Sequence, residues 1–101
     1  MIMLLSEFWN QDDEDAGQPF SGSSGRFIAS CLSQVGIKFD DCYRTSVLQF
    51  RPPSGDLKRI CVANKKDGVP GFPSLLKSGY LNKQFTSELD RLFTEIETVN
   101  P

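Results

Sequence analysis

The order of apolar, polar and amphipathic segments in the first 35 residues is compatible with few folds. A continuous apolar run, Met1 to Leu5, is followed by a polar loop over residues 10–25 and then by an amphipathic helical pattern over residues 26–35. An unbroken apolar run bounded by polar residues predicts a strand buried on both faces, as in a parallel sheet. A loop between such a strand and a helix lies at the carboxyl edge of the sheet, where α/β proteins bind ligands.

The end of this loop is built from small residues, Gly22-Ser23-Ser24-Gly25. Backbone N–H groups near a helix N-terminus attract anions, so we expect Gly22, Ser23 and Ser24 to hold a phosphate. Ser23 or Ser24 is expected to cap the helix, and Gly36 to end it. The buried stripe of this helix is predicted to consist of five residues: Phe27, Ile28, Cys31, Leu32 and Val35.

The remaining chain predicts a second strand over residues 42–50, which Arg51-Pro52-Pro53 ends because proline cannot continue a ladder. Residues 52–74 are rich in proline, glycine and charge, which predicts a long irregular loop with an extended piece at 60–63 and a helical turn at 73–77. A last helix starts at Asn82 or Thr86, with an apolar face of Phe85, Leu89, Leu92, Phe93 and Ile96. The prediction is an α/β fold, a small three-layer structure around a parallel sheet.

Composition limits the function. With 101 residues the chain is expected to form one domain over 1–101. The net charge of -2 argues against broad, phosphate-dominated nucleic-acid binding but leaves room for a local basic edge of Arg44, Arg51, Lys58 and Arg59. Three cysteines without a C-x-x-C pair, and no histidine, predict no metal site and no cofactor. The acidic run over residues 12–15 is interpreted as solvated, since adjacent acids do not converge on a cation. The alternative is a role in positioning Glu7 or in repelling a wrongly placed phosphate.

Two ordered sequence blocks resemble a known family. The first block consists of Glu7, Trp9, Asp13, Glu14, Gly17, Pro19, Phe20, Gly22 and Gly25. The second block runs from Tyr43 to Pro53 and is similar to a Tyr-x-Thr-Asn-x-x-x-x-Arg-Pro-Pro motif. Together they resemble the N-terminal half of family 4-like uracil-DNA glycosylases and of related domains at the front of some phage DNA polymerases.

The resemblance implies a role for each matching residue. Glu7 would orient or activate the attacking water, and Phe20 would stack on the flipped base. Ser46 stands where the family has a base-reading asparagine, and Arg51 would contact the DNA backbone. Ser46 offers one hydroxyl in place of the donor and acceptor of an amide. A cysteine that usually ligates an iron-sulfur cluster corresponds here to Phe50, so the resemblance does not bring the cluster with it.

Three functions follow as hypotheses. The first is a phage replication- or repair-associated DNA-binding domain without independent catalysis, acting on single-stranded or uracil-containing DNA in the cytoplasm of an infected bacterium. The second is half of an active glycosylase that needs a second polypeptide, such as a phage DNA polymerase, because the family's second catalytic motif lies in the half of the domain beyond this chain. The third is a small interaction protein that reuses the fold to bind a protein partner. Met1 to Leu5 is too short for a signal peptide and no run is long enough to span a membrane, so no membrane association is expected.

Overall fold

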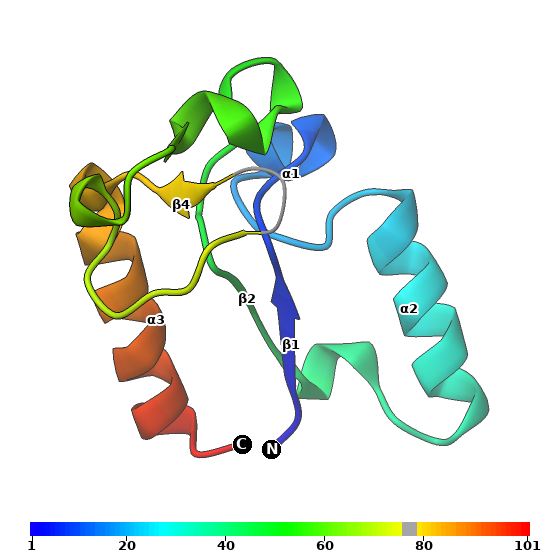
Figure 1. The fold of residues 1–101 in the computed structure, drawn as a ribbon. Helices are drawn as coiled ribbons and strands as arrows, with labels where there is room; N and C mark the ends of the chain where they lie inside the picture. The colour runs from blue at the N-terminus through cyan, green and yellow to red at the C-terminus, as the bar shows by residue number, and fades with distance from the viewer. Residues whose placement is uncertain (76–78) are drawn as a thin grey trace.

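Two parallel strands form the centre of the fold. The computed structural model describes residues 1–75 and 79–101. Strand β1 (Met3–Ser6) pairs with β2 (Tyr43–Ser46) in parallel, with Met3 opposite Tyr43 and Ser6 opposite Ser46. Helices α2 (Ser23–Gln34) and α3 (Thr86–Val99) lie on opposite sides of this pair (Figure 1). The expected α/β architecture with a small parallel sheet is confirmed.

Both strands differ from their predictions. β1 is not buried on both faces, because the side chain of Leu5 is 48 % exposed and only β2 pairs with it among the described residues. β2 ends at Ser46, four residues before the predicted end at Phe50. The chain beyond Ser46 bends but stays beside the first segment, since Leu48 N–H donates to the Glu7 carbonyl over 3.0 Å.

The prediction of a loop throughout residues 10–25 is wrong, because a short helix, α1 (Gln11–Ala16), forms there. Its start is a reciprocal capping box: the Asn10 side chain accepts from Asp13 N–H, and the Asp13 carboxylate accepts from Asn10 N–H. Gly17 ends the helix with φ of 73°, a conformation that favours glycine. Acidic residues in the first turn are also favoured by the helix dipole.

Helix α2 begins at Ser23, three residues earlier than predicted, and Gly22 rather than a serine is its N-cap. Its apolar stripe is only half covered. Ile28 and Leu32 are partly buried, whereas Phe27 and Val35 are each 70 % exposed. Cys31 is exposed as well, so its assignment to the core is wrong.

The 52–74 segment is irregular, as predicted, but it is not only a surface excursion. It holds three 3₁₀ turns, at Pro53–Gly55, Leu57–Ile60 and Lys65–Asp67. β3 (Cys61–Val62) confirms the expected extended piece and pairs antiparallel with β4 (Tyr80–Leu81). The helical turn expected at 73–77 falls partly outside the described residues.

The buried core lies between this segment and α3. The residues of its main cluster are Leu48, Ile60, Val69, Leu81 and Leu89. Ile60 and Val69 come from the irregular segment, which explains why a stretch rich in proline and charge still folds onto the domain. Helix α3 starts at Thr86 as predicted, after a 3₁₀ turn at Lys83–Phe85 that the Asn82 side chain caps.

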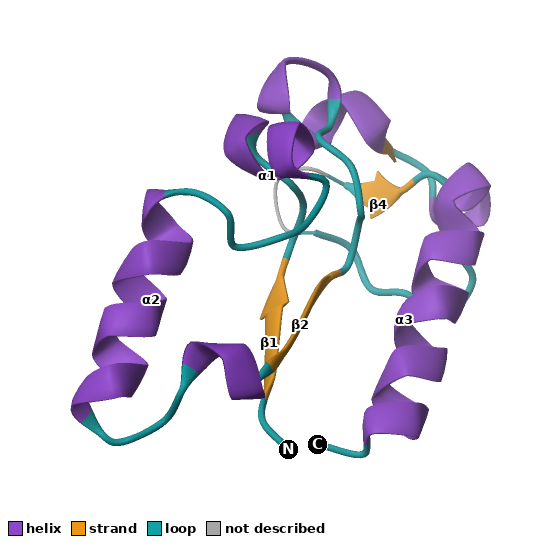
Figure 2. Ribbon diagram, turned by 180° about the vertical axis from the view of Figure 1, so that it is seen from behind, coloured by secondary structure: helices purple, strands orange, loops and turns teal. Residues whose placement is uncertain are grey.

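The two chain ends lie near each other at the same end of the molecule in both views (Figures 1 and 2). Within the part of the chain that the structure describes, no helix has the length and apolar character needed to cross a membrane.

Candidate functional site

A cavity of about 180 Å³ opens where β1 and the glycine-rich loop meet. The cavity is lined by Ser6, Phe8, Asn10, Asp13, Phe20, Gly22, Ser24 and Gly25. Three residues expected to bind DNA, Phe20, Gly22 and Ser24, therefore surround one space. Ser23, the neighbour of two of them, is exposed to solvent at the start of α2.

The backbone around Phe20 is tightly constrained. Phe20 has φ of 60°, in the left-handed region that non-glycine residues rarely adopt. Its carbonyl oxygen packs directly on Gly25, where a Cβ atom would lie only 2.0 Å from that oxygen. Strained backbone of this kind persists where the surrounding structure fixes it, and it is common at binding sites.

Asp13 stabilises the loop that carries Phe20 through hydrogen bonds of its carboxylate. Its carboxylate accepts from the backbone N–H of Ser21 over 2.8 Å and from that of Asn10 over 3.1 Å, and the residue is only 5 % exposed. The interpretation of the whole acidic run as solvated is therefore wrong for Asp13. A buried carboxylate that accepts two N–H groups joins α1 to the loop that carries Phe20.

The N-terminus of α2 faces the same cavity. No side chain of the described residues caps its first N–H groups, because the N-cap is Gly22. A Cβ atom on Gly22 would lie 2.5 Å from Asp12 Oδ2, so the Asp12 carboxylate sits close to this helix end. The positive end of the helix dipole is thus partly offset by an acid at the place where a phosphate would bind.

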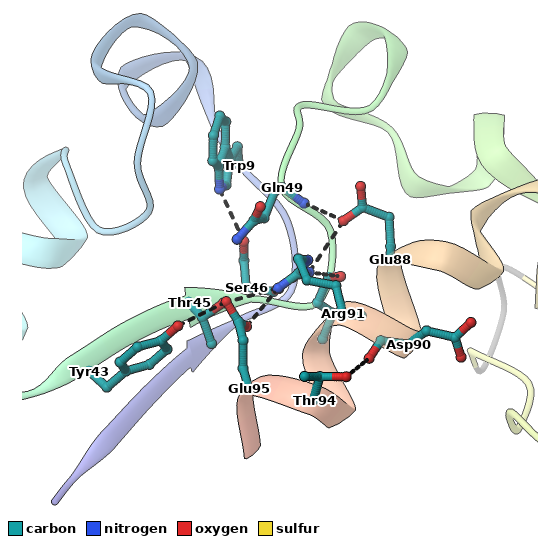
Figure 3. Close-up of polar contacts among 11 residues, drawn as sticks. Trp9, Tyr43, Thr45, Ser46, Gln49, Glu88, Asp90, Arg91, Thr94 and Glu95 are labelled. Carbon is teal, nitrogen blue, oxygen red and sulfur yellow. Dashed lines mark hydrogen bonds and ion pairs between the residues drawn. The ribbon is translucent and has the colours of Figure 1, made fainter. Parts of the chain in front are cut away.

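Ser46 lies beneath Trp9. It is fully buried, and its hydroxyl accepts a hydrogen bond of 3.0 Å from the indole N–H of Trp9 (Figure 3). Phe8 and Asn10, the chain neighbours of Trp9, both line the cavity, whereas Ser46 does not. The structure therefore places Ser46 next to the cavity wall but behind Trp9.

Arg91 of α3 forms hydrogen bonds to the end of β2. Its Nη2 atom donates to the carbonyl oxygens of Ser46 and Val47 over 2.7 and 2.8 Å, and its Nη1 atom donates to Thr45 Oγ1 over 3.2 Å. Two carboxylates flank the guanidinium, Glu95 at 2.7 Å and Glu88 at 3.2 Å (Figure 3). Together these bonds fix the backbone that follows Ser46.

The same cluster perturbs one titratable group. Tyr43 donates from its hydroxyl to Glu95 Oε1 over 3.0 Å. Burial raises the pKa of Tyr43 above its ordinary value of 10.0, and the hydrogen bond to Glu95 and the charge of Glu95 raise that pKa further. The nearby Arg91 charge acts in the opposite direction.

Two predicted site residues lie away from the cavity. Glu7 is exposed and lines a separate cavity of about 90 Å³, whose other walls are Val47, Leu48, Leu57, Phe72, Leu75 and Leu81. Arg51 is half-buried, and its guanidinium lies beside Gly55. The structure thus brings Phe20 and the small residues together but does not bring Glu7 or Arg51 to them.

Beside Phe20 lie an aromatic ring and a cation that the sequence did not indicate. The ring of Phe39 meets that of Phe20 edge-on, with centroids 6.4 Å apart, and the Arg44 guanidinium lies 4.5 Å above the Phe39 centroid. Such contacts favour one ring orientation for Phe20. No sequence signal indicated Phe39, because it lies in a connector 19 residues further along the chain.

The residues do not fit an iron-sulfur cluster. At the position where the family has a cysteine, the Phe50 ring packs on that of Phe85 with centroids 5.3 Å apart. Burial raises the pKa of the Cys61 thiol, which disfavours the thiolate form that binds metals. Among the residues at 1–75 and 79–101, no group of three or more histidine, cysteine or acidic side chains could hold a metal ion.

These features define a class of protein: an α/β domain with a cavity between its first strand and a glycine-rich loop. The family model of the uracil DNA glycosylase superfamily matches residues 2–101, and the chain belongs to this superfamily.

Curated relatives match a part of the chain. The type-4 uracil-DNA glycosylase of Archaeoglobus fulgidus is 34 % identical over 53 residues, which are 52 % of this chain and 27 % of that protein. The type-4 enzyme of Pyrobaculum aerophilum is 32 % identical with the same coverage, and that of Thermotoga maritima is 30 % identical over 53 residues, 28 % of its length. Because 53 residues are 27 % of each archaeal protein, the 101-residue chain spans about half their length. No solved structure matches the chain.

Proposed function

We propose that this chain is a uracil-DNA glycosylase-like domain that binds DNA, in the context of DNA replication or repair, without independent catalysis. The observation that supports it best is the cavity in which Phe20 lies beside Gly22, Ser24 and an uncapped helix N-terminus. An aromatic ring can stack on an unpaired base, and free backbone N–H groups can donate hydrogen bonds to the adjoining phosphate. Such stacking contributes about 1–3 kcal/mol per base.

The position of Glu7 supports the absence of independent catalysis. A residue that activates water must come within hydrogen-bond distance of the reacting atoms. Glu7 lines a different cavity from Phe20, on the side of the irregular segment. A base stacked on Phe20 would then lack a nearby carboxylate in the role that the resemblance assigns to Glu7.

The biological setting is proposed from the sequence resemblance alone. Domains of this kind stand at the front of some phage DNA polymerases, so the proposed setting is phage replication or repair in the cytoplasm of an infected bacterium. A phage DNA polymerase is the proposed protein partner.

The test is a binding assay with single-stranded oligonucleotides that carry one uracil or none, at low and moderate salt. We expect binding that weakens about tenfold in Phe20→Ala, the loss of one stacked base. Val35→Ala, at an apolar and 70 % exposed position away from the cavity, is the control and should bind like the wild type. Absence of binding at both salt concentrations would overturn the proposal.

A specific observation also favours the second candidate, half of an active glycosylase. Large apolar side chains remain exposed near the N-terminus, along α2 and its C-cap, and on α3: Met1, Ile2, Leu5, Phe27, Val35, Phe93 and Ile96. Groups of exposed apolar residues are typical of surfaces that another polypeptide covers. A sheet edge beside them could accept a further strand.

Complementation tests this candidate. The chain would be mixed with the C-terminal half of the Archaeoglobus fulgidus enzyme, and uracil excision would be measured. Under this candidate the mixture forms a complex and excises uracil, and Leu5→Lys prevents both. A mixture that neither associates nor reacts would contradict it.

A further inference from the structure

The charge of the chain is divided unequally along the sequence. Residues 57–83 contain six of the eleven Lys and Arg residues but only one of the thirteen Asp and Glu residues. This segment therefore carries a formal charge of +5, whereas the rest of the chain carries -7. The overall charge of -2 thus conceals a basic segment, and none of the residues that line the Phe20 cavity belongs to that segment.

The exposed cations of this segment lie on three 3₁₀ turns. None of them forms an ion pair with a carboxylate among residues 1–75 and 79–101, and Asp67, the acid within the segment, is partly buried. Their charges are therefore available to an anion outside the chain. The members of this group, here called the cationic turns, are Lys58, Arg59, Lys65, Lys66 and Lys83.

The short sheet of β3 and β4 brings the three turns together around Asn82. The N–H of Asn82 donates to the Ile60 carbonyl, at the end of the first turn, over 3.0 Å. Asn82 also forms a β-bridge with Gly68, which directly follows the second turn. The third turn starts at the next residue, Lys83. Cations that are far apart in the sequence therefore lie around one short sheet.

The side chains of this surface fit a nucleic-acid backbone better than a protein or a lipid bilayer. Every large apolar side chain that is exposed in the described part of the chain lies outside residues 57–83. Protein interfaces have a core of apolar or aromatic residues and few lysines, and segments that bind a membrane surface need an apolar face. A phosphate backbone requires only accessible Lys and Arg side chains.

The cationic turns and the Phe20 loop leave the parallel sheet at the same edge. The Phe20 loop follows β1, the segment with the turns follows β2, and the two strands are parallel neighbours. The two segments stay joined beyond the strands, since Trp9 N–H donates to the Phe50 carbonyl over 3.1 Å. Both views show α1 and the turns beyond the same ends of β1 and β2 (Figures 1 and 2). One DNA strand can therefore contact the loop and the turns together.

We infer that the cationic turns bind the phosphate backbone of the DNA strand next to the base that Phe20 holds. This inference rests on the proposed DNA binding. Backbone contacts carry no sequence information, so the turns add affinity for any sequence. A lysine contacts a phosphate through the end of a four-carbon side chain. The backbone amides of the turns are therefore expected to shift less in NMR spectra than those of the Phe20 loop.

The experiment measures the affinity for a single-stranded oligonucleotide without uracil over a range of salt concentrations. Each phosphate contact on a single strand contributes about 0.7 to the slope of log affinity against log salt concentration. The double variant Lys65→Gln/Lys66→Gln is therefore expected to lower this slope by about 1.4 and to weaken binding about tenfold at low salt. The same loss is expected with a second oligonucleotide of unrelated sequence.

The control is Ser30→Glu/Gln34→Glu, which changes the net charge by the same amount at exposed positions of α2 outside the Phe20 cavity. It should keep the slope of the wild type. An equal change of slope in both double variants, or a change in neither, overturns the inference. Binding that weakens in Phe20→Ala but not in the lysine variant overturns the inference and leaves the proposed function standing. A wild type that binds at no salt concentration refutes both.

Discussion

The carbonyl oxygen of Phe20 packs against the Cα atom of Gly25, with no room for a side chain: a Cβ atom on Gly25 would lie 2.0 Å away. This contact holds the left-handed backbone of Phe20 over the start of α2. Gly25 is thus required for close approach of two backbone segments, not for an unusual φ of its own.

Gly25→Ala is expected to lower the free energy of unfolding by about 1–3 kcal/mol, because the Phe20 loop must move away to admit a methyl group. Chemical denaturation followed by Trp9 fluorescence measures the change. Ser30→Ala, an exposed position on the same helix, should leave stability within about 0.5 kcal/mol of the wild type. Equal stability of the two variants would contradict the close contact.

Asp12→Asn is expected to strengthen DNA binding about two- to fivefold, since it removes a negative charge beside the uncapped N-terminus of α2. Binding of a single-stranded oligonucleotide at low salt measures the gain. Glu14→Gln, an equal change of charge at an exposed position of the same acidic run, separates this local effect from that of net charge. An equal gain in both variants would show that the Asp12 carboxylate has no particular effect on this site.

Arg91→Met should lower the free energy of unfolding by about 2–3 kcal/mol, because the carbonyl groups of Ser46 and Val47 lose their donor and two carboxylates lose their counter-charge. Thermal denaturation is the measurement. Arg59→Met, at an exposed arginine without an ion pair among the described residues, is the matched control. A melting temperature unaffected by Arg91→Met would show that the hydrogen bonds of Arg91 to the end of β2 do not stabilise the fold.

Stability at high pH depends on Tyr43. Its pKa is raised in the folded state, so the unfolded chain loses the phenol proton at lower pH than the folded protein. The contribution of Tyr43 is complete below about pH 10 and declines as pH rises through the folded-state pKa. Between pH 9 and 12, Tyr43→Phe should therefore lose stability less steeply than the wild type. Parallel curves would show that Tyr43 has the same pKa in both states.

The sequence predicted the strand-loop-helix order around Phe20 because each element has a local signal: an apolar run, glycines and an amphipathic repeat. It did not predict α1, although Asn10 and Asp13 have the spacing of a capping box, since four adjacent acids suggested only a solvated loop. Cys31 shows a different limit. Helical spacing tells which face is apolar, but whether another element covers that face depends on the tertiary fold.

The polar partners of the site required the structure. Trp9 and Ser46 are 37 residues apart, and Arg91 is 45 residues from Ser46. Which side chains meet depends on the rotation of α3 against β2 and on the bend after Ser46, and neither has a local sequence signal. The motif indicated Ser46 by its position but not that Trp9 would cover it.

The most direct test of the account is an NMR titration of the ¹⁵N-labelled chain with a single-stranded, uracil-containing oligonucleotide. DNA binding at the cavity predicts that the largest amide shifts occur at residues 20–25, with small shifts on the exposed face of α3. Shifts concentrated on α3 or on the 52–74 segment, or none at all, would contradict the placement of DNA at the Phe20 loop.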